Sequence, residues 1–273
     1  MTDRYAVIGN PISHSQSPFI HAEFAQATGQ DMNYEKLFAE LGQFVPVVQA
    51  FFANGGKGLN VTLPFKGDAF RFADEVTEAA RLAEAVNTLT LRDGRIYGDN
   101  TDGTGLVRDI VDNLDVPVTG QRVLLLGAGG AVRGVLQPLL AQQPQALTIA
   151  NRTVIKAESL AYQFRALGDI EAVGYDALQG RQFDIVINGT STSLSNELPP
   201  IPAGIFSGRS LAYDMVYSRG LTPFLRRAQS ENAGMLADGL GMLVEQAAES
   251  FRIWRDIQPA TRKVTNMLRE VLA

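Results

Sequence analysis

Hydrophobic residues in the first third of the chain follow two different spacings, and each spacing predicts a different element. The short apolar run Tyr5–Ile8 predicts a buried strand, and further strands are predicted over 33–39 and 58–63. Over 44–52, apolar residues recur at intervals of three and four, which predicts an amphipathic helix. A hairpin is predicted over 88–98, where Asp93-Gly94 suits the turn. This region therefore predicts a mixture of strands and helices.

The first helix has recognisable end signals. Ser17 followed by Pro18 has the form of an N-cap with proline at the first helical position. Gly29 is suited to close the same helix, because glycine adopts the left-handed conformation without strain. We therefore predict a helix that Ser17 caps and Gly29 ends.

A second series of elements begins after residues 115–120, where Pro117 and Gly120 suit a domain boundary. A helix over 103–114 comes before it, and helices over 239–255 and 260–272 close the chain. Between them, the pattern predicts strands over 123–126, 146–150, 183–188, 211–215 and 235–237, and helices over 131–142 and 155–167. Strands that alternate with helices of this length predict a parallel, doubly wound sheet.

Composition narrows the class of protein. The chain has 273 residues, of which 45% are hydrophobic and 19% charged, so we expect a globular protein of about two domains. The formal net charge is −5 and no run of Lys and Arg reaches four residues, so we expect no nucleic-acid partner. The chain has no cysteine and only two histidines, which excludes thiolate chemistry and leaves little room for a metal centre; we expect no metal. Without a signal-peptide pattern or an apolar run of about 20 residues, a cytoplasmic protein with no membrane partner is expected.

A glycine-rich turn joins the first predicted strand of the second series to its helix. It consists of Gly127, Ala128, Gly129, Gly130 and Ala131. Gly127 can make the tight turn, and Gly129 allows backbone amides to approach a pyrophosphate at the positive end of the helix. A tight turn without a ligand is the alternative. The position of the glycine-rich turn between a predicted strand and a predicted helix favours a dinucleotide site.

The residues after the next strand distinguish between cofactors. NAD enzymes usually carry Asp or Glu there, whereas this chain has Asn151, Arg152 and Thr153, with Lys156 close behind. Arg152 can pair with a 2′-phosphate, so NADP is predicted rather than NAD. The alternative is that Arg152 and Lys156 are solvated cations at the start of a helix.

Several short segments of the first domain are rich in polar groups, and in α/β proteins ligands gather where strands end. The polar groups are Ser15, Ser17, Asn60, Thr62, Lys66, Asn87 and Asn100–Asp102. Each has a structural alternative. Ser17 and Asp102 can cap helices, and Lys66 alone would be an ordinary surface cation.

Taken together, these segments resemble the shikimate dehydrogenase family along essentially the whole chain. The matching segments are Gly9–Pro18, Asn60–Lys66, Glu84–Thr88, Gly98–Gly103, Gly127–Ala131, Asn151–Thr153, Asp214–Tyr217 and Asp238–Gly239. The resemblance implies an NADP-dependent enzyme of aromatic amino-acid and chorismate biosynthesis. It also implies two α/β domains: a discontinuous substrate-binding and catalytic domain (1–103 and 239–273) that the C-terminal helices complete, and a Rossmann-type NADP-binding domain (104–238).

The resemblance also implies roles for individual residues. Lys66 and Asp102 correspond to the catalytic pair. Shikimate would be held by Ser15, Ser17, Thr62, Asn87, Tyr217 and Gln246. The NADP-binding segments would be Gly127–Ala131, Asn151–Thr153 and Lys156, with Met215 and Gly239 at the nicotinamide end.

The implied reaction is the reversible reduction of 3-dehydroshikimate to shikimate by NADPH. The developing alkoxide needs a proton, and the candidate pair for supplying it is Lys66 with Asp102. We expect Lys66 to transfer the proton. Asp102 is expected to orient the Lys66 side chain and to bind a substrate hydroxyl. Two alternatives stay open: a quinate/shikimate dehydrogenase that uses NAD or NADP, and a non-catalytic metabolite or nucleotide sensor on the same fold. Either a monomer or a homodimer is compatible with the sequence.

Overall fold

The computed structural model describes residues 2–195 and 197–272. The chain forms two compact units. Residues up to Gly105 together with Val244–Asn266 form the first unit, and Leu106–Leu243 together with the residues from Met267 onward form the second. The expected division into one domain of 1–103 with 239–273 and another of 104–238 remains a prediction, and the residues from Met267 onward group with the second unit. The assignment of substrate to the first unit and NADP to the second remains a prediction.

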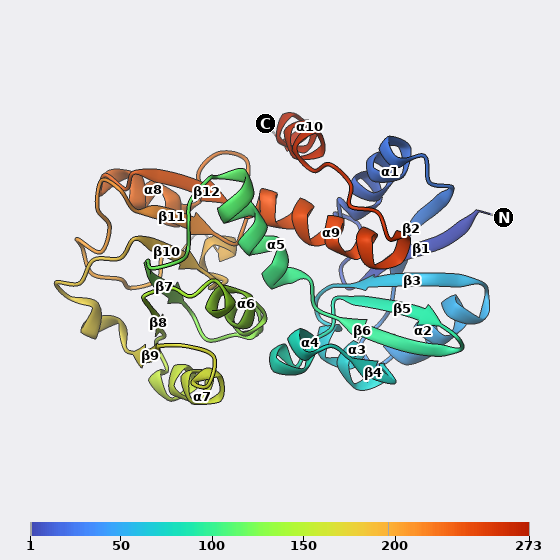
Figure 1. Ribbon diagram of the computed structural model, residues 1–273, viewed down its shortest axis with the longest axis horizontal. Helices are drawn as coiled ribbons and strands as arrows, with labels where there is room; N and C mark the ends of the chain where they lie inside the picture. Colours follow the sequence, from blue (N-terminus) through green and yellow to red (C-terminus); the bar gives the residue numbers. More distant parts are fainter. Residues whose placement is uncertain (1, 196, 273) are drawn as a thin grey trace. The chain divides into compact units, whose positions relative to one another are not determined.

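The first unit contains a mixed six-stranded sheet (Figure 1). Its strands are β1 (Asp3–Gly9), β2 (Met32–Phe38), β3 (Gly56–Val61), β4 (Glu75–Val76), β5 (Thr88–Arg92) and β6 (Arg95–Asp99). They lie in the order β2-β1-β3-β5-β6-β4, and β5 runs antiparallel to both β3 and β6. Because of this reversal, the carboxyl ends of β1, β3 and β6 and the amino end of β5 meet at one edge of the sheet.

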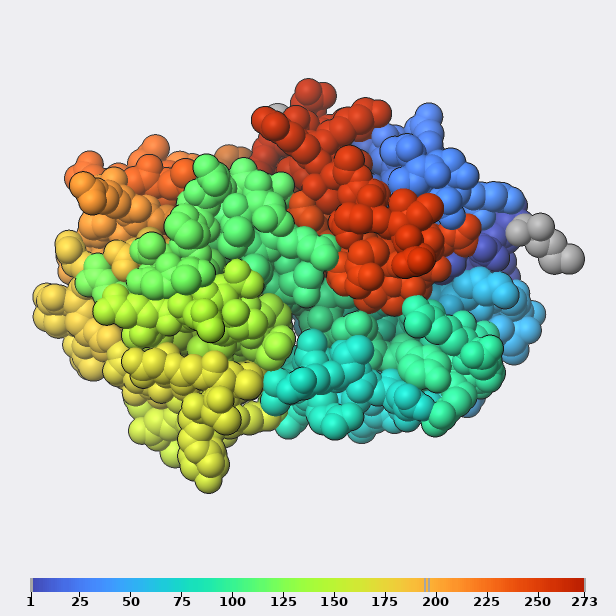
Figure 2. Space-filling model, in the orientation of Figure 1, coloured from blue at the N-terminus to red at the C-terminus, as the bar shows by residue number. Residues whose placement is uncertain are grey.

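Helices cover both faces of this sheet: α1 (Ser17–Thr28), α2 (Phe44–Ala53), α3 (Lys66–Phe72), α4 (Glu78–Ala83) and α9 (Leu240–Arg255). On one face, Phe44 and Phe51 of α2 pack with Ile8 and Leu59 of the strands, as the predicted amphipathic helix requires. On the other face, α1 and the later part of α9 lie side by side (Figure 2), and the rings of Phe24 and Phe251 are 5.7 Å apart. The sheet is therefore buried on both faces.

The start of α1 differs from the prediction. Gln16 occupies the N-cap position and Ser17 is the first helical residue, so the predicted cap by Ser17 is wrong. The Ser17 hydroxyl instead accepts a hydrogen bond from the Ser15 hydroxyl, with an Oγ–Oγ distance of 3.2 Å. The other end is confirmed: Gly29 has φ +65° and its N–H reaches the carbonyls of Ala25 and Gln26.

The second unit contains a parallel six-stranded sheet, which confirms the predicted doubly wound fold. Its strands are β7 (Arg122–Leu126), β8 (Ala146–Ala150), β9 (Ile170–Val173), β10 (Ile185–Asn188), β11 (Leu211–Asp214) and β12 (Met235–Asp238). Their order is β12-β11-β10-β7-β8-β9, so the strand order reverses between β7 and β10. Ligands of doubly wound sheets bind at this switch point, beyond the carboxyl ends of the strands.

The remaining helices of the second unit connect these strands. They are α6 (Gly130–Ala141), α7 (Val154–Phe164) and α8 (Pro223–Ser230), with 3-10 turns at Tyr175–Leu178 and Thr192–Ser195. Phe224 and Leu225 of α8 pack with Leu124 and Leu126 of β7 in one buried cluster. α10 (Arg262–Leu272) carries Arg269, whose guanidinium binds both oxygens of Asp238 at 2.6 and 2.8 Å. The sequence did not predict β9 or α8.

The helix predicted over 103–114 consists of two parts. α5 spans Asp102–Arg108, and a π-helical turn follows over Asp109–Asn113. Asp109 is buried and accepts a hydrogen bond from the Tyr213 hydroxyl at 2.7 Å. A side chain on Gly241 would collide with the Asp109 carboxylate, so glycine makes this packing possible. Over the described ranges, no helix is long and apolar enough to cross a bilayer.

Candidate functional site

Lys66 and Asp102 form an ion pair at the sheet edge of the first unit. Lys66 begins α3, shortly after β3, and Asp102 begins α5, shortly after β6. Lys66 Nζ lies 2.5 Å from Asp102 Oδ2, and the two side chains are 27% and 16% exposed. The pair is therefore held in one geometry but remains within reach of a ligand. The Asp102 carboxylate binds Lys66 and Asn87, so the alternative that it serves only as a helix cap does not describe its contacts.

Asn87 and Gln246 complete this cluster. Asn87 lies at the amino end of β5, and its Nδ2 donates to Asp102 Oδ1 at 2.9 Å. The same Nδ2 lies 3.3 Å from Oε1 of Gln246, which α9 contributes. Four residues predicted from the sequence are thus brought together from four elements. The cluster combines an ammonium group, a carboxylate and two amides, which suits a ligand with hydroxyl and carbonyl groups.

Ser15, Ser17 and Thr62 lie in or beside the loops that follow β1 and β3, at the same edge of the sheet. The backbone N–H of Asn10 donates to the carbonyl of Leu63 at 3.1 Å and joins the two loops. A Cβ on Gly9 would lie only 2.6 Å from Thr62 Cγ2, so glycine permits this close approach. These hydroxyls therefore lie on loops that are fixed against each other.

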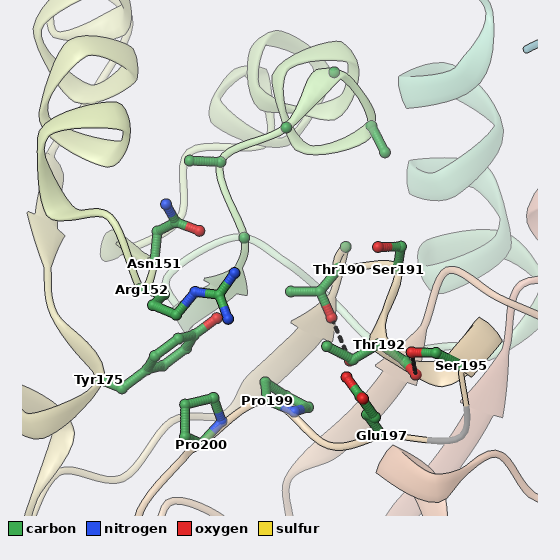
Figure 3. Close-up of a pocket in the computed structure, with 16 residues that line it drawn as sticks. Asn151, Arg152, Tyr175, Thr190, Ser191, Thr192, Ser195, Glu197, Pro199 and Pro200 are labelled. Carbon is green, nitrogen blue, oxygen red and sulfur yellow. Dashed lines mark hydrogen bonds between the residues drawn. The ribbon is translucent and has the colours of Figure 1, made fainter. Parts of the chain in front are cut away.

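The second unit contains a pocket of about 460 Å³ beyond the carboxyl ends of β7, β8 and β10 (Figure 3). The predicted residues that line it are Gly127–Ala131, Asn151 and Arg152. Residues that the sequence analysis missed also line it: Tyr175, Gly189–Thr192, Ser195, Glu197, Pro199 and Pro200. A usable signal existed, because the small polar run Gly189–Thr192 directly follows β10 at the switch point of the sheet.

The glycine turn has the backbone geometry that a dinucleotide requires. Gly127 has φ +107°, which residues with a side chain rarely adopt, and a Cβ there would press against Thr190 at 3.1 Å. Gly129 and Gly130 face open space, and α6 begins at Gly130. The free N–H groups at the start of α6 can therefore meet an anionic ligand without steric hindrance.

Arg152 and Tyr175 form one wall of the pocket. Figure 3 shows the guanidinium of Arg152 beside the Tyr175 ring, with Thr190 and Thr192 on the opposite side. Burial raises the pKa of Tyr175, and the nearby positive charge of Arg152 offsets part of that rise. Tyr175 therefore presents a neutral hydroxyl beside a cation, which together suit a phosphate ester.

Other predicted cofactor residues do not line this pocket. Thr153 occupies the N-cap position of α7, and the backbone N–H of Lys156 donates to its carbonyl at 3.1 Å. A side chain on Gly239 would collide with the carbonyl of Met215, so these two residues are packed together beyond β11 and β12. Tyr217 is half-buried, and burial followed by the charge of Asp238 raises its pKa. The roles of these residues remain predictions.

Comparison with known proteins identifies the family. The model of the shikimate dehydrogenase substrate binding domain matches residues 7–89, that of shikimate/quinate 5-dehydrogenase matches 106–196, and that of the shikimate 5′-dehydrogenase C-terminal domain matches 239–269. The chain is 77% identical to a shikimate dehydrogenase (NADP(+)) of Chromobacterium violaceum over the full length of both proteins.

Solved structures agree with this result. An Ael1 enzyme from Pseudomonas putida superposes with a TM-score of 0.94 at 51% identity, covering 97% of this chain and 98% of that one. Shikimate 5-dehydrogenase from Thermus thermophilus, solved in complex with NADP(H) and shikimate, has a TM-score of 0.87 at 30% identity and covers 99% and 100%. By sequence and by fold, this chain belongs to the shikimate dehydrogenase family.

Proposed function

We propose that this protein catalyses the reversible reduction of 3-dehydroshikimate to shikimate with NADPH. The observation that carries the proposal is the partly exposed Lys66–Asp102 pair, joined to Asn87 and Gln246 at one edge of the first sheet. The relatives named above support it, since they are shikimate dehydrogenases and one was solved with both ligands. A sensor without catalytic activity would have no need for an ammonium group beside a carboxylate.

The second unit fits the dinucleotide. Backbone N–H groups of Gly129–Ala131 would hold the pyrophosphate, and Arg152 would pair with the 2′-phosphate. No carboxylate occurs among Ala150–Thr153, where an NAD enzyme would bind the ribose hydroxyls. When bound, NADPH supplies the hydride.

The side chains of the first unit would bind the substrate and move the proton. Ser15 and Ser17 would donate to the ring carboxylate, while Thr62, Asn87 and Gln246 would bind ring hydroxyls. Lys66 would donate a proton to the substrate ketone oxygen as it becomes a hydroxyl. Asp102 would orient Lys66 through their ion pair and accept a hydrogen bond from a neighbouring hydroxyl. Because Lys66 is partly exposed, water can restore its proton after each turnover.

Steady-state kinetics test this proposal. We expect shikimate oxidation with NADP⁺ by the unmodified protein, followed by the absorbance of NADPH. Lys66→Ala should lower kcat by about 10²–10⁴, the usual effect of removing an acid–base group. Lys57→Ala, which alters an exposed lysine on β3, is the matched control and should leave kcat unchanged. A kcat of Lys66→Ala within about threefold of the unmodified protein would contradict the assigned role.

Substrate and cofactor preference form a second test, because the matching family includes quinate enzymes. We expect kcat/KM to be highest for shikimate with NADP⁺. Quinate carries an extra hydroxyl at the carbon that bears the carboxylate, beside the two predicted serines. A higher kcat/KM for quinate with NAD⁺ would favour the alternative of a dual-specificity enzyme.

A further inference from the structure

A chain of polar side chains, buried except for the half-buried Tyr34, leads across the first sheet from β2 to the Lys66–Asp102 pair. It begins at Tyr34 on β2, whose hydroxyl donates to Asn60 Oδ1 at 2.7 Å. Nδ2 of Asn60, on β3, donates to the hydroxyl of Ser250 at 3.0 Å. The Ser250 side chain, contributed by α9, is fully buried.

The chain continues through β5 to the catalytic carboxylate. The hydroxyls of Ser250 and Thr88 lie 2.7 Å apart, and Thr88 donates to Asn87 Oδ1 at 2.9 Å. Asn87 Nδ2 donates to Asp102 Oδ1 at 2.9 Å. We call the five residues Tyr34, Asn60, Ser250, Thr88 and Asn87 the buried chain.

The direction of these hydrogen bonds follows from the carboxylate. An ionised Asp102 only accepts, so Asn87 must present its Nδ2 to Asp102 and its Oδ1 to Thr88. Each hydroxyl has a single hydrogen, so once Thr88 donates to Asn87, only Ser250 can donate in the 2.7 Å bond between Ser250 and Thr88; the Gln246 carbonyl is a second, more distant acceptor for Ser250, at 3.1 Å. Every link then donates toward Asp102. The backbone N–H of Thr101 also donates to Asn87 Oδ1, at 2.9 Å, and supports the same amide orientation.

The first residue of the buried chain lies in an environment that keeps its hydroxyl protonated. Burial raises the pKa of Tyr34 well above its usual value, and an interaction with Ser17 offsets only part of that rise. The Tyr34 ring stacks on His21 at a centroid distance of 4.2 Å. Burial lowers the pKa of His21 to about 3, so this neighbour stays uncharged at neutral pH. Tyr34 therefore keeps its hydroxyl proton at neutral pH and can donate at the start of the chain.

We propose that the buried chain positions the Lys66–Asp102 pair by holding the Asn87 amide in one orientation. The inference rests on the proposed function, because it concerns the geometry of proton transfer. Thr88, Ser250, Asn60 and Tyr34 touch neither substrate nor cofactor in this account. They are positioning residues that act through Asn87, and Thr88 is the link next to it.

Substitution of Thr88 tests the proposal most directly. Thr88→Val keeps the shape but removes the hydroxyl, which leaves Asn87 Oδ1 with fewer donors and leaves the Ser250 hydroxyl with the Gln246 carbonyl as its acceptor, at 3.1 Å. We expect kcat to fall about tenfold, the equivalent of about 1.4 kcal/mol in the activation barrier, with KM for NADP⁺ unchanged. Thr88→Ser restores the hydroxyl and should return kcat to within about twofold of the unmodified protein.

Tyr34→Phe removes the first donor and should lower kcat about threefold, because Asn60, Ser250 and Thr88 lie between Tyr34 and Asn87 in the buried chain. Tyr97→Phe, on β6 of the same sheet and outside the buried chain, is the matched control and should keep full activity. If Thr88→Val does not fold, Tyr34→Phe and Ser250→Ala decide the question in the same assay.

Two outcomes overturn the inference. The first is a kcat per folded protein that stays within about twofold of the unmodified protein in Thr88→Val or, if that variant does not fold, in both Tyr34→Phe and Ser250→Ala. The second is a Thr88→Ser variant whose kcat is as low as that of Thr88→Val. The activity of the unmodified protein distinguishes a failure of the positioning role from a failure of the proposed function. Shikimate turnover with an unaffected Thr88→Val variant overturns the positioning role alone, whereas an unmodified protein without shikimate turnover overturns the proposed function and this inference with it.

Discussion

Two carboxylates at the carboxyl ends of strands, one in each unit, have opposite surroundings. Asp102 in the first unit is partly exposed and binds Lys66 and Asn87. Asp214 in the second unit is fully buried at the end of β11. It accepts hydrogen bonds from Ser193 and Thr222 hydroxyls at 2.6 Å each, and further bonds from Asn188 Nδ2 and the backbone N–H of Val216.

The difference shows how one side chain can serve chemistry or architecture. Asp214 is surrounded by protein donors, so it holds the loops after β10 and β11 together and has no face for a ligand. Its burial raises its pKa, although the four hydrogen bonds offset part of the rise. Asp102 keeps an accessible side and a cation, so it can act on a bound molecule. Exposure and free hydrogen-bonding capacity, more than residue type, distinguish the two.

The largest effect is expected from Asp102→Asn. Its amide cannot form an ion pair with Lys66, so kcat for shikimate should fall about thousandfold, within the range for disrupted acid–base catalysis. Thermal unfolding should show little change, because the site is partly exposed. If Asp102→Asn kept a tenth or more of the kcat of the unmodified protein, the chemical role assigned to Asp102 would be wrong.

Asp214→Ala should show the reverse behaviour and reduce stability. The substitution leaves the Ser193 and Thr222 hydroxyls and the Asn188 amide without their buried acceptor. We expect the free energy of unfolding, measured by urea denaturation, to fall by about 3 kcal/mol. Asp169→Ala, at an exposed position of the same unit, should change it by less than about 0.5 kcal/mol. Equal effects of the two variants would exclude an architectural role for Asp214.

His21 in the first unit and Asp214 in the second unit should make the free energy of unfolding change with pH in opposite directions. Burial lowers the pKa of His21 to about 3, so between about pH 6.5 and 3 only the unfolded state binds its proton. Stability from His21 is complete above that range and is lost, by about 1.4 kcal/mol per pH unit, as pH falls. The pKa of Asp214 is raised above its usual 3.8 in the folded state, so just above that pH the folded state binds the proton more tightly than the unfolded state does. The contribution of Asp214 to the free energy of unfolding therefore falls as pH rises through this range.

Urea denaturation between about pH 5 and 7.5 tests the His21 part of this comparison. His21→Phe should remove the slope, whereas His14→Gln, which alters the exposed histidine, should retain it. An unchanged slope in His21→Phe would show that another group causes it.

A smaller effect than those at Asp102 and Asp214 is expected in the cofactor pocket. Arg152→Ala should raise KM for NADP⁺ about tenfold and leave KM for NAD⁺ nearly unchanged, because only NADP carries the 2′-phosphate. Arg209→Ala, at an exposed position of the second unit, is the control. Equal increases in KM for both dinucleotides would mean that Arg152 does not recognise the 2′-phosphate.

Much of the fold was predictable because its signals are local. The apolar run before Gly127 and the glycines after it indicated a strand, a turn and a helix, and the structure has them there. The π-helical turn at Asp109 was not predictable, since it depends on contacts with Tyr213 and with the space above Gly241. The N-cap assigned to Ser17 failed for a similar reason, because its hydroxyl bonds to Ser15 instead.

The candidate site divides in the same way. Motifs and the family resemblance named Lys66, Asp102 and Asn87, and the antiparallel course of β5 explains how they meet. Tyr34 and Ser250 belong to no motif, and 190 positions separate Ser250 from its partner Asn60. No periodicity in the chain could have paired them.

The sequence alone determined the alternation of strands and helices, the glycine turn and the family, because each depends on neighbouring residues or on short segments read in order. The tertiary structure decided which carboxylate stays accessible, which histidine loses its charge and which way the Asn87 amide points. Burial and the direction of a hydrogen bond depend on whichever groups lie about 3 Å away, and folding brings those groups from distant parts of the chain.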